Sequence, residues 1–338
     1  MKGSATAKKR FTVITLCLSV GVLLYFLFTT DGIDTLWRIK SNIEPIWLLW
    51  AVLAVIGRWL IEGYVLLILS RHLDPRWQFR KSFTVGMIGF LYSALTPFAA
   101  GEPMEIYAMN RMGMGAGASG SVITVKALIY QVVMLGYSLF FVAVKLAYFR
   151  QILIHLALIV LATLIINGIF ITVMLTVMIN AKLTKKILRL SMKVIYATRF
   201  CRHPRRLYRK IYRQLISFHD SAAIMGRSTP LYLKAGVLTL IQITFSSVIP
   251  FFIYRSFHLR GASFFTMLAA DTFVTMASEF VPLPGATGGA EGGFFLFFQS
   301  AFGSAIIPAI LLWRVITYYS SIVFGYLTTS IASKHHLM

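Results

Sequence analysis

Carboxylates are scarce in this sequence, and charge of either sign is limited. Its 338 residues include 11 Asp and Glu against 33 Lys and Arg, and 58% of the residues are hydrophobic. Only 13% are charged, whereas a soluble domain has about a quarter of its residues charged. The composition therefore excludes an ordinary soluble protein and predicts a polytopic membrane protein. In such a chain the net charge of +22 indicates basic loops facing anionic lipid, and we expect no nucleic-acid partner.

Cysteine and nucleotide-binding motifs are also scarce. Cys17 lies in the first apolar run and Cys201 in a basic stretch, so no disulfide framework is implied. A Walker-type phosphate loop is missing, which argues against ATP hydrolysis by this chain. The sequence also has no Asp-x-Asp motif of the kind that holds a metal in lipid-linked glycosyltransferases. We predict neither a cofactor nor a metal site.

Long apolar runs separated by charged links are the main feature that is present. They predict membrane spans at 11–28, 46–69, 118–145, 151–180, 230–254 and 304–331. The segment 182–213 carries twelve Lys or Arg and no acid. By the positive-inside rule, this segment and both termini are expected in the cytosol of a multi-pass protein of the cytoplasmic membrane. Apolar residues at near-helical spacing within the segment favour contact with anionic lipid of the inner leaflet.

Two apolar segments are interrupted by proline and glycine. Residues 82–117 contain TPFAAGEP, and residues 263–301 contain FVPLPGATGGAEGG. Proline and glycine weaken or end a helix, and broken backbone at membrane depth is tolerated only inside protein or beside water. The positions of the basic links place both ends of the first segment in the cytosol and both ends of the second segment outside. Both segments are therefore predicted to be re-entrant helical hairpins. The predicted breaks lie at Pro97, Gly101, Pro282, Pro284, Gly285, Gly288 and Gly289.

The order of spans and hairpins recurs with inverted orientation. We predict an all-α fold in which a single transmembrane domain, 1–338, has a first half at about 1–147 and a second half at about 151–332. The basic segment 182–213 is an insertion in the second half. Such inverted repeats with broken helices occur in transporters. Matched spacing supports the repeat: Glu291 follows Glu102 by 189 positions. Likewise, Arg314 follows Lys126 by 188 positions.

Ionisable residues inside apolar segments are candidate functional residues, because their burial in a membrane is costly. The spacing predicts that Glu102 pairs with Lys126 and that Glu291 pairs with Arg314. Structural alternatives remain open, since Arg58 could simply pair with Glu62 on one face of its helix. Asp271 and Glu279 could likewise hold the helices together by pairing with cations. The candidate substrate-binding residues are Arg58, Glu62, Glu102, Lys126, Tyr130, Glu279, Glu291, Arg314 and Tyr318.

The motifs TPFAAGEP, PLPGATGGAEGGFF and LLWRVITYY together resemble the flippase-like transmembrane region of lysylphosphatidylglycerol synthases. The resemblance covers essentially the whole chain, and its specific part is the second hairpin with the arginine-tyrosine segment after it. In bifunctional members, the multiple peptide resistance factors, this region moves aminoacylated phosphatidylglycerol to the outer leaflet. The residues that the resemblance carries over are Gly101, Glu102, Gly285, Gly289, Glu291 and Arg314.

The resemblance implies translocation of a phospholipid or an aminoacylated phospholipid. The sequence ends at Met338, shortly after the last predicted span, so we expect a stand-alone, non-enzymatic member served by a separate lipid-modifying enzyme. A lipid phosphate is expected at Lys126 and Arg314. An amine on the headgroup is expected at Glu102 and Glu291.

Two other functions are considered. The first is an ion-coupled transporter of a small solute, because inverted hairpins with carboxylates also serve that purpose. The second is an intramembrane serine protease, because residues 117–120 read GASG. Its serine would need a base within hydrogen-bond reach, and the only later histidine within a predicted span is His155.

Overall fold

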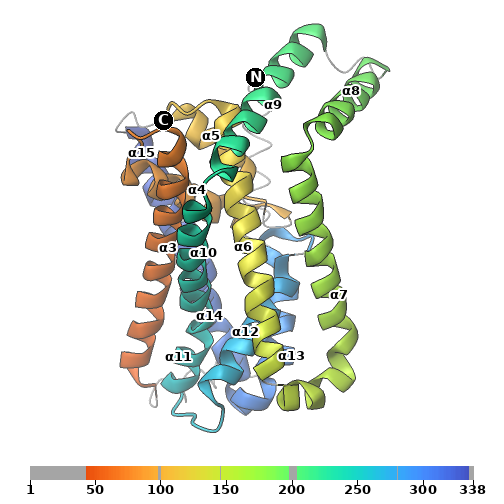
Figure 1. Cartoon of the computed structure of the whole chain (residues 1–338). Helices are drawn as coiled ribbons and strands as arrows, with labels where there is room; N and C mark the ends of the chain where they lie inside the picture. The colour runs from red at the N-terminus through yellow and green to blue at the C-terminus, as the bar shows by residue number, and fades with distance from the viewer. Residues whose placement is uncertain (1–42, 98–99, 145, 198–203, 280, 335–338) are drawn as a thin grey trace.

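The protein is an all-helical bundle. The computed structural model describes residues 43–97, 100–144, 146–197, 204–279 and 281–334, and the span predicted at 11–28 lies outside them. No strand occurs in the described ranges. The helices are α3 (Pro45–Leu73), α4 (Phe79–Leu95), α5 (Glu102–Arg111), α6 (Ala116–Val144), α7 (Leu146–Ile179), α8 (Ala181–Ala197), α9 (Pro204–Gly226), α10 (Thr229–Ser247), α11 (Ile249–Ser256), α12 (Phe264–Glu279), α13 (Gly289–Phe302), α14 (Ile306–Arg314) and α15 (Ser320–Lys334) (Figure 1).

Several helices are long and apolar enough to cross a membrane. Within the described residues there are four such helical runs, or five if the bent pair formed by α7 and α8 is one span. Large apolar side chains remain exposed around the bundle, among them Leu53, Ile169, Leu233 and Tyr326. A soluble monomer rarely exposes so much continuous apolar surface. The prediction of a multi-pass helical membrane protein is confirmed.

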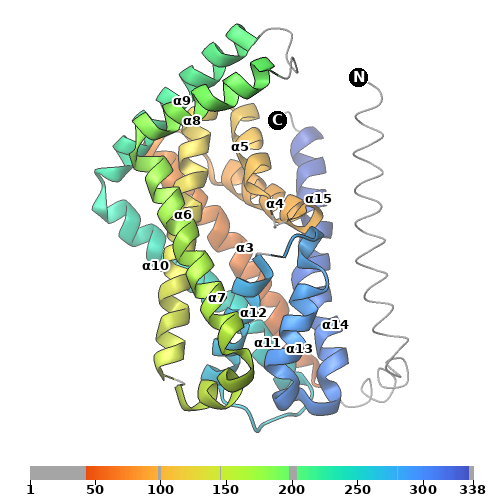
Figure 2. The ribbon, with the colours of Figure 1, turned by 90° about the vertical axis from the view of Figure 1, so that its right-hand side faces the viewer.

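Two helix–break–helix units lie toward opposite ends of the bundle. α4 packs against α5 near the end that also holds α9, whereas α12 packs against α13 toward the other end (Figures 1 and 2). The 3-10 turn η2 (Pro284–Ala286), which follows α12, packs against α4. The two broken segments therefore meet inside the bundle.

The helix breaks follow from local backbone chemistry. α4 ends before Pro97, which disfavours helical backbone at the residue before it. α5 begins at Glu102 with proline in its first turn, where a missing N–H is tolerated. Between α12 and α13 the chain turns through Gly285 and Gly288, whose φ angles are 60° and 85°. Glycine is the residue that reaches these left-handed angles at least cost.

Aromatic packing fixes the second unit in the bundle. Phe294 of α13 lies 4.9 Å from Trp313 of α14, between ring centroids. Phe302, at the end of α13, lies 5.4 Å from Tyr254 of α11. Each of these side chains has at least nine-tenths of its surface buried. Burial of this aromatic surface holds α13 against both neighbours.

The described residues of the basic segment, 182–197 and 204–213, are helical. α8 bends away from α7 by 95°, and α9 packs against α6. Both helices lie at the same end of the bundle as α5 (Figures 1 and 2). α8 carries exposed Ile187 and Leu190 among its basic residues, so it is an amphipathic helix, as the spacing of its apolar residues indicates.

Candidate functional site

A cavity of about 780 Å³ lies between the two broken segments and the helices around them. Seven of the nine predicted binding residues line it. Glu291 does not line the cavity but is paired with Arg314, which does. The side chain of Glu279, the last residue of α12, is outside the described part. The lining residues from the prediction are Arg58, Glu62, Glu102, Lys126, Tyr130, Arg314 and Tyr318.

Lys126 of α6 holds two carboxylates on one side of the cavity. Its Nζ lies 2.7 Å from Glu62 Oε1 on α3 and 2.7 Å from Glu105 Oε2 on α5. The second oxygen of Glu62 accepts a hydrogen bond of 2.7 Å from Gln242 Nε2 on α10. All three ionisable side chains are at least 85% buried. One ammonium therefore joins three helices, and an amide adds a fourth.

Two glycines of α4 make room for this cluster. A Cβ on Gly89 would collide with the carboxylate of Glu105, and a Cβ on Gly86 would lie 2.9 Å from Glu62 Cγ. Real Cβ atoms do not approach other atoms so closely. The two carboxylates reach Lys126 because α4 presents bare backbone at these positions.

The predicted pairing of Glu102 with Lys126 is wrong. Glu102 is the first residue of α5 and is exposed, and it is not among the ion-pair partners of Lys126. Its place is taken by Glu105, which lies one turn later and is 3% exposed. Glu102 still lines the cavity, where its carboxylate is available to a ligand.

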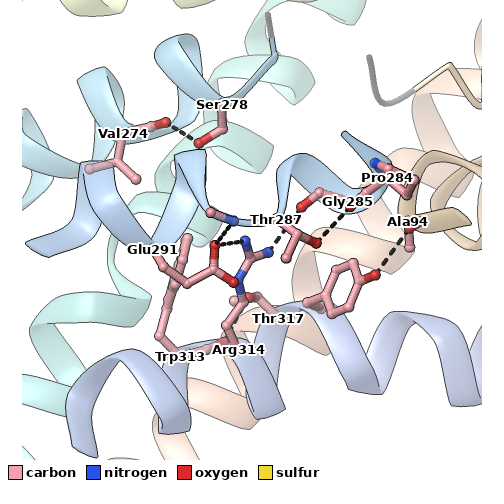
Figure 3. Close-up of polar contacts among 12 residues, drawn as sticks. Ala94, Val274, Ser278, Pro284, Gly285, Thr287, Glu291, Trp313, Arg314 and Thr317 are labelled. Carbon is pink, nitrogen blue, oxygen red and sulfur yellow. Dashed lines mark hydrogen bonds and ion pairs between the residues drawn. The ribbon is translucent and has the colours of Figure 1, made fainter. Parts of the chain in front are cut away.

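The predicted pair of Glu291 and Arg314 is formed (Figure 3). Arg314 Nη2 lies 2.8 Å from Glu291 Oε2. The same carboxylate oxygen accepts a hydrogen bond of 2.7 Å from the backbone N–H of Gly288. Glu291 thus caps the start of α13, where the helix dipole also favours a negative charge.

Arg314 is held on several sides. Its Nη1 donates to Gly285 O at 3.2 Å. Its Cζ lies 5.2 Å from the ring centroid of Trp313 and 5.1 Å from that of Tyr318. Its Nε is buried without a hydrogen-bond partner in the described part of the chain. Directly after it, the helix widens into the π-helical stretch η4 (Val315–Tyr319), a distortion common at functional sites.

Tyr318 joins the two broken segments. Its hydroxyl donates to Ala94 O at the end of α4, at 3.1 Å, and its ring lies against Gly285. A Cβ on Gly285 would collide with that ring. The glycine is therefore required both by its positive φ angle and by the close approach of Tyr318.

Arg58 and Asp271 complete the charged lining, and neither is placed as expected. Arg58 does not pair with Glu62, whose nearest cation is Lys126. The Cζ of Arg58 instead lies 4.7 Å from the ring centroid of Phe90. Asp271 is 2% exposed and lines the cavity. Its predicted pairing with a cation is absent from the described ion pairs.

The sequence reasoning missed Glu105 and Gln242 as parts of the site. Glu105 carried a signal, because it is an acid beside an apolar segment, but its neighbour Glu102 carried the same signal. Gln242 is a neutral residue in an apolar span and gave none. Counted over the described residues and with Glu291 included, the site holds two more carboxylates than cations.

Ser119, the serine of the GASG sequence, is fully buried near the start of α6. Its Oγ hydrogen-bonds to the carbonyl oxygens of Met114 and Gly115, at 3.3 and 3.1 Å. The hydroxyl therefore stabilises the start of a helix. The side chain of His155 is outside the described part.

These features define a multi-pass helical membrane protein with charged side chains lining a cavity between its helices. Residues 12–325 match the family described as the lysylphosphatidylglycerol synthase TM region, and the chain belongs to this family. The resemblance seen in the motifs is thereby confirmed. No curated protein sequence matched the chain.

The two acids at the start of α5 give a test of the site geometry. We expect Glu105→Gln to lower the free energy of unfolding by about 1.5–3 kcal/mol, because it weakens hydrogen bonds to a buried ammonium. Glu102→Gln is the matched control and should change stability by less than about 0.5 kcal/mol. Unfolding of the purified protein in mixed micelles measures both variants. Equal losses for the two would contradict the assignment of Glu105 as the partner of Lys126.

Proposed function

We propose that this protein moves a phospholipid or an aminoacylated phospholipid across the cytoplasmic membrane, with the headgroup passing through the charged cavity. Membership of the lysylphosphatidylglycerol synthase TM family supports a lipid-related role. The observation that carries the proposal is a large cavity lined by charged side chains within a bundle whose outer surface is apolar. A polar headgroup needs such an environment to cross hydrocarbon, while its acyl chains remain in lipid.

The composition of the cavity favours a headgroup that bears an amine. Among the described residues, carboxylates outnumber cations there, and no described cation lies within ion-pair distance of Glu102 or Asp271. An ammonium group can bind to either by charge-assisted hydrogen bonds. A purely anionic headgroup would make no use of these carboxylates. A separate lipid-modifying enzyme would supply an aminoacylated substrate.

In this proposal, the two helix–break–helix units are re-entrant hairpins that enter from opposite faces of the membrane, in halves of inverted orientation. Their place at opposite ends of the bundle supports this, as does the contact between η2 and α4. Both termini and the basic helices would be cytosolic by the positive-inside rule. Rocking of the halves about the contact of Tyr318 with Ala94 would expose the cavity to each leaflet in turn.

Lipid movement can be measured in proteoliposomes with tail-labelled fluorescent lipids and a membrane-impermeant quencher. We expect the wild type to move lysylphosphatidylglycerol or phosphatidylethanolamine. A variant combining Glu291→Gln with Arg314→Gln leaves no unpaired charge, and it should be slower by about tenfold, equivalent to about 1.4 kcal/mol in the barrier.

Protein-free liposomes are the control for spontaneous movement. Wild-type protein that moves no lipid above this control would contradict the proposal. Ion-driven uptake of a soluble substrate by such protein would instead indicate the small-solute transporter. A well-folded double variant with the wild-type rate would show that lipid movement does not depend on this pair.

We also propose that α8 rests on an anionic lipid surface. It turns 95° from α7, and its exposed Ile187 and Leu190 can enter the headgroup region. Each basic residue near such a surface contributes about 1 kcal/mol of attraction. The basic residues of α8 are Lys182, Lys185, Lys186, Arg189 and Lys193.

A fluorophore on Leu190→Cys, in a background without Cys17 and Cys201, tests this contact. Brominated lipids should quench it more strongly in phosphatidylglycerol vesicles than in phosphatidylcholine vesicles, because the attraction is electrostatic. Adding Lys185→Gln and Lys186→Gln should remove most of that difference. Equal quenching in both vesicle types would show that anionic lipid is not recognised by α8.

A further inference from the structure

The three cations that line the cavity are not equally available to a ligand. Lys126 is shared by the carboxylates of Glu62 and Glu105. Arg314 is paired with Glu291. A phosphate that approached either cation would have to compete with a buried carboxylate already in contact with it. The expected phosphate site at Lys126 and Arg314 is therefore occupied by the protein's own acids.

Arg58 differs from the other two. It lines the cavity and stacks on Phe90, with 4.7 Å from Cζ to the ring centroid. No carboxylate of the described residues lies within ion-pair distance of it. Stacking occupies the face of a guanidinium group and leaves its edge, with five N–H donors, free to bind an oxyanion.

The surroundings of Arg58 suit a group that is bound and then released. Glu62 follows it by one helical turn and is held by Lys126 and Gln242. Asp271 lines the same cavity, and no ion pair joins it to Arg58 among the described residues. These carboxylates balance the charge of Arg58 at longer range without occupying its donors. A lipid phosphate can therefore bind without breaking an existing ion pair.

We propose that Arg58 is the anion-binding subsite of the cavity and receives the phosphate of the transported lipid. The inference rests on the proposed function and names the residue that recognises the phosphodiester common to its substrates. Two N–H groups of Arg58 donate to two phosphate oxygens, a bidentate geometry that a lysine cannot reproduce. The amine of the same headgroup is then left to the unpaired carboxylates.

A purely structural role for Arg58 makes a different prediction. If its charge only balances the excess of carboxylates, its loss should affect every lipid alike. If it binds phosphate, its loss should matter only for lipids that contain phosphate. The comparison therefore uses two tail-labelled probes with the same acyl chains: phosphatidylethanolamine and a diacyl aminopropane, which has an amine but no phosphate.

Arg255 provides a matched control. It also stacks on an aromatic ring, with 5.2 Å from Cζ to the ring centroid of Trp47, but it does not line the cavity. Arg58→Gln should slow phosphatidylethanolamine about tenfold while changing the rate of the aminopropane lipid less than about twofold. Arg255→Gln should leave both rates unchanged. Arg58→Lys keeps the positive charge but loses the paired N–H donors of the guanidinium group. It should also slow the movement of the phospholipid alone.

Equilibrium binding of the same probes in detergent separates the failure of this inference from that of the proposed function. Phosphatidylethanolamine should bind about tenfold more weakly to Arg58→Gln than to wild type, whether or not the wild type transports it. Equal losses for both probes, or no loss for either, would overturn the assignment. Inorganic phosphate is the third probe: if its binding depends on Arg58 while both lipids bind as to wild type, the ligand is a free anion and the lipid assignment fails.

Discussion

A charge buried in a low-dielectric interior is costly without a partner, and Lys126 shows how this protein lowers that cost. Its ammonium holds Glu62 of α3 and Glu105 of α5 at 2.7 Å each. Removing one partner from a buried ion pair costs about 3–5 kcal/mol, because the other charge is then left uncompensated. The positions of α3, α5 and α6 are therefore coupled. The glycines of α4 that face this cluster are a consequence of the same pairing.

The pair of Glu291 and Arg314 holds the helices on the other side of the cavity together, as Lys126 does on the first side. Glu291 caps α13 and holds Arg314, whose guanidinium group also binds the backbone of the broken segment at Gly285. Tyr318 then connects this segment to α4. The result is a cavity whose walls are fixed by internal pairs, while Arg58, Glu102 and Asp271 have no ion-pair partner among the described residues. In our proposal, a headgroup with both charges satisfies these remaining groups.

Much of the fold could be predicted from the sequence, because ionisable residues and Pro-Gly breaks are conspicuous within apolar runs. The pair of Glu291 and Arg314 followed from such signals. Which of Glu102 and Glu105 pairs with Lys126 could not be predicted from the sequence. Both lie on one short helix, and only packing decides which of them faces inward. Gln242 carries no charge and gave no signal. The helices of the basic segment were only partly expected, and the inverted repeat stays a prediction.

The central claim is that paired charges inside the bundle hold the cavity together, and a double-mutant cycle on Glu291 and Arg314 tests it most directly. The free energy of unfolding is measured in mixed micelles for Glu291→Gln, Arg314→Gln and the two combined. We expect either single change to cost more than the double change, with a coupling energy of about 1–3 kcal/mol. Strictly additive losses would contradict the account, because they would show that the two side chains do not stabilise each other.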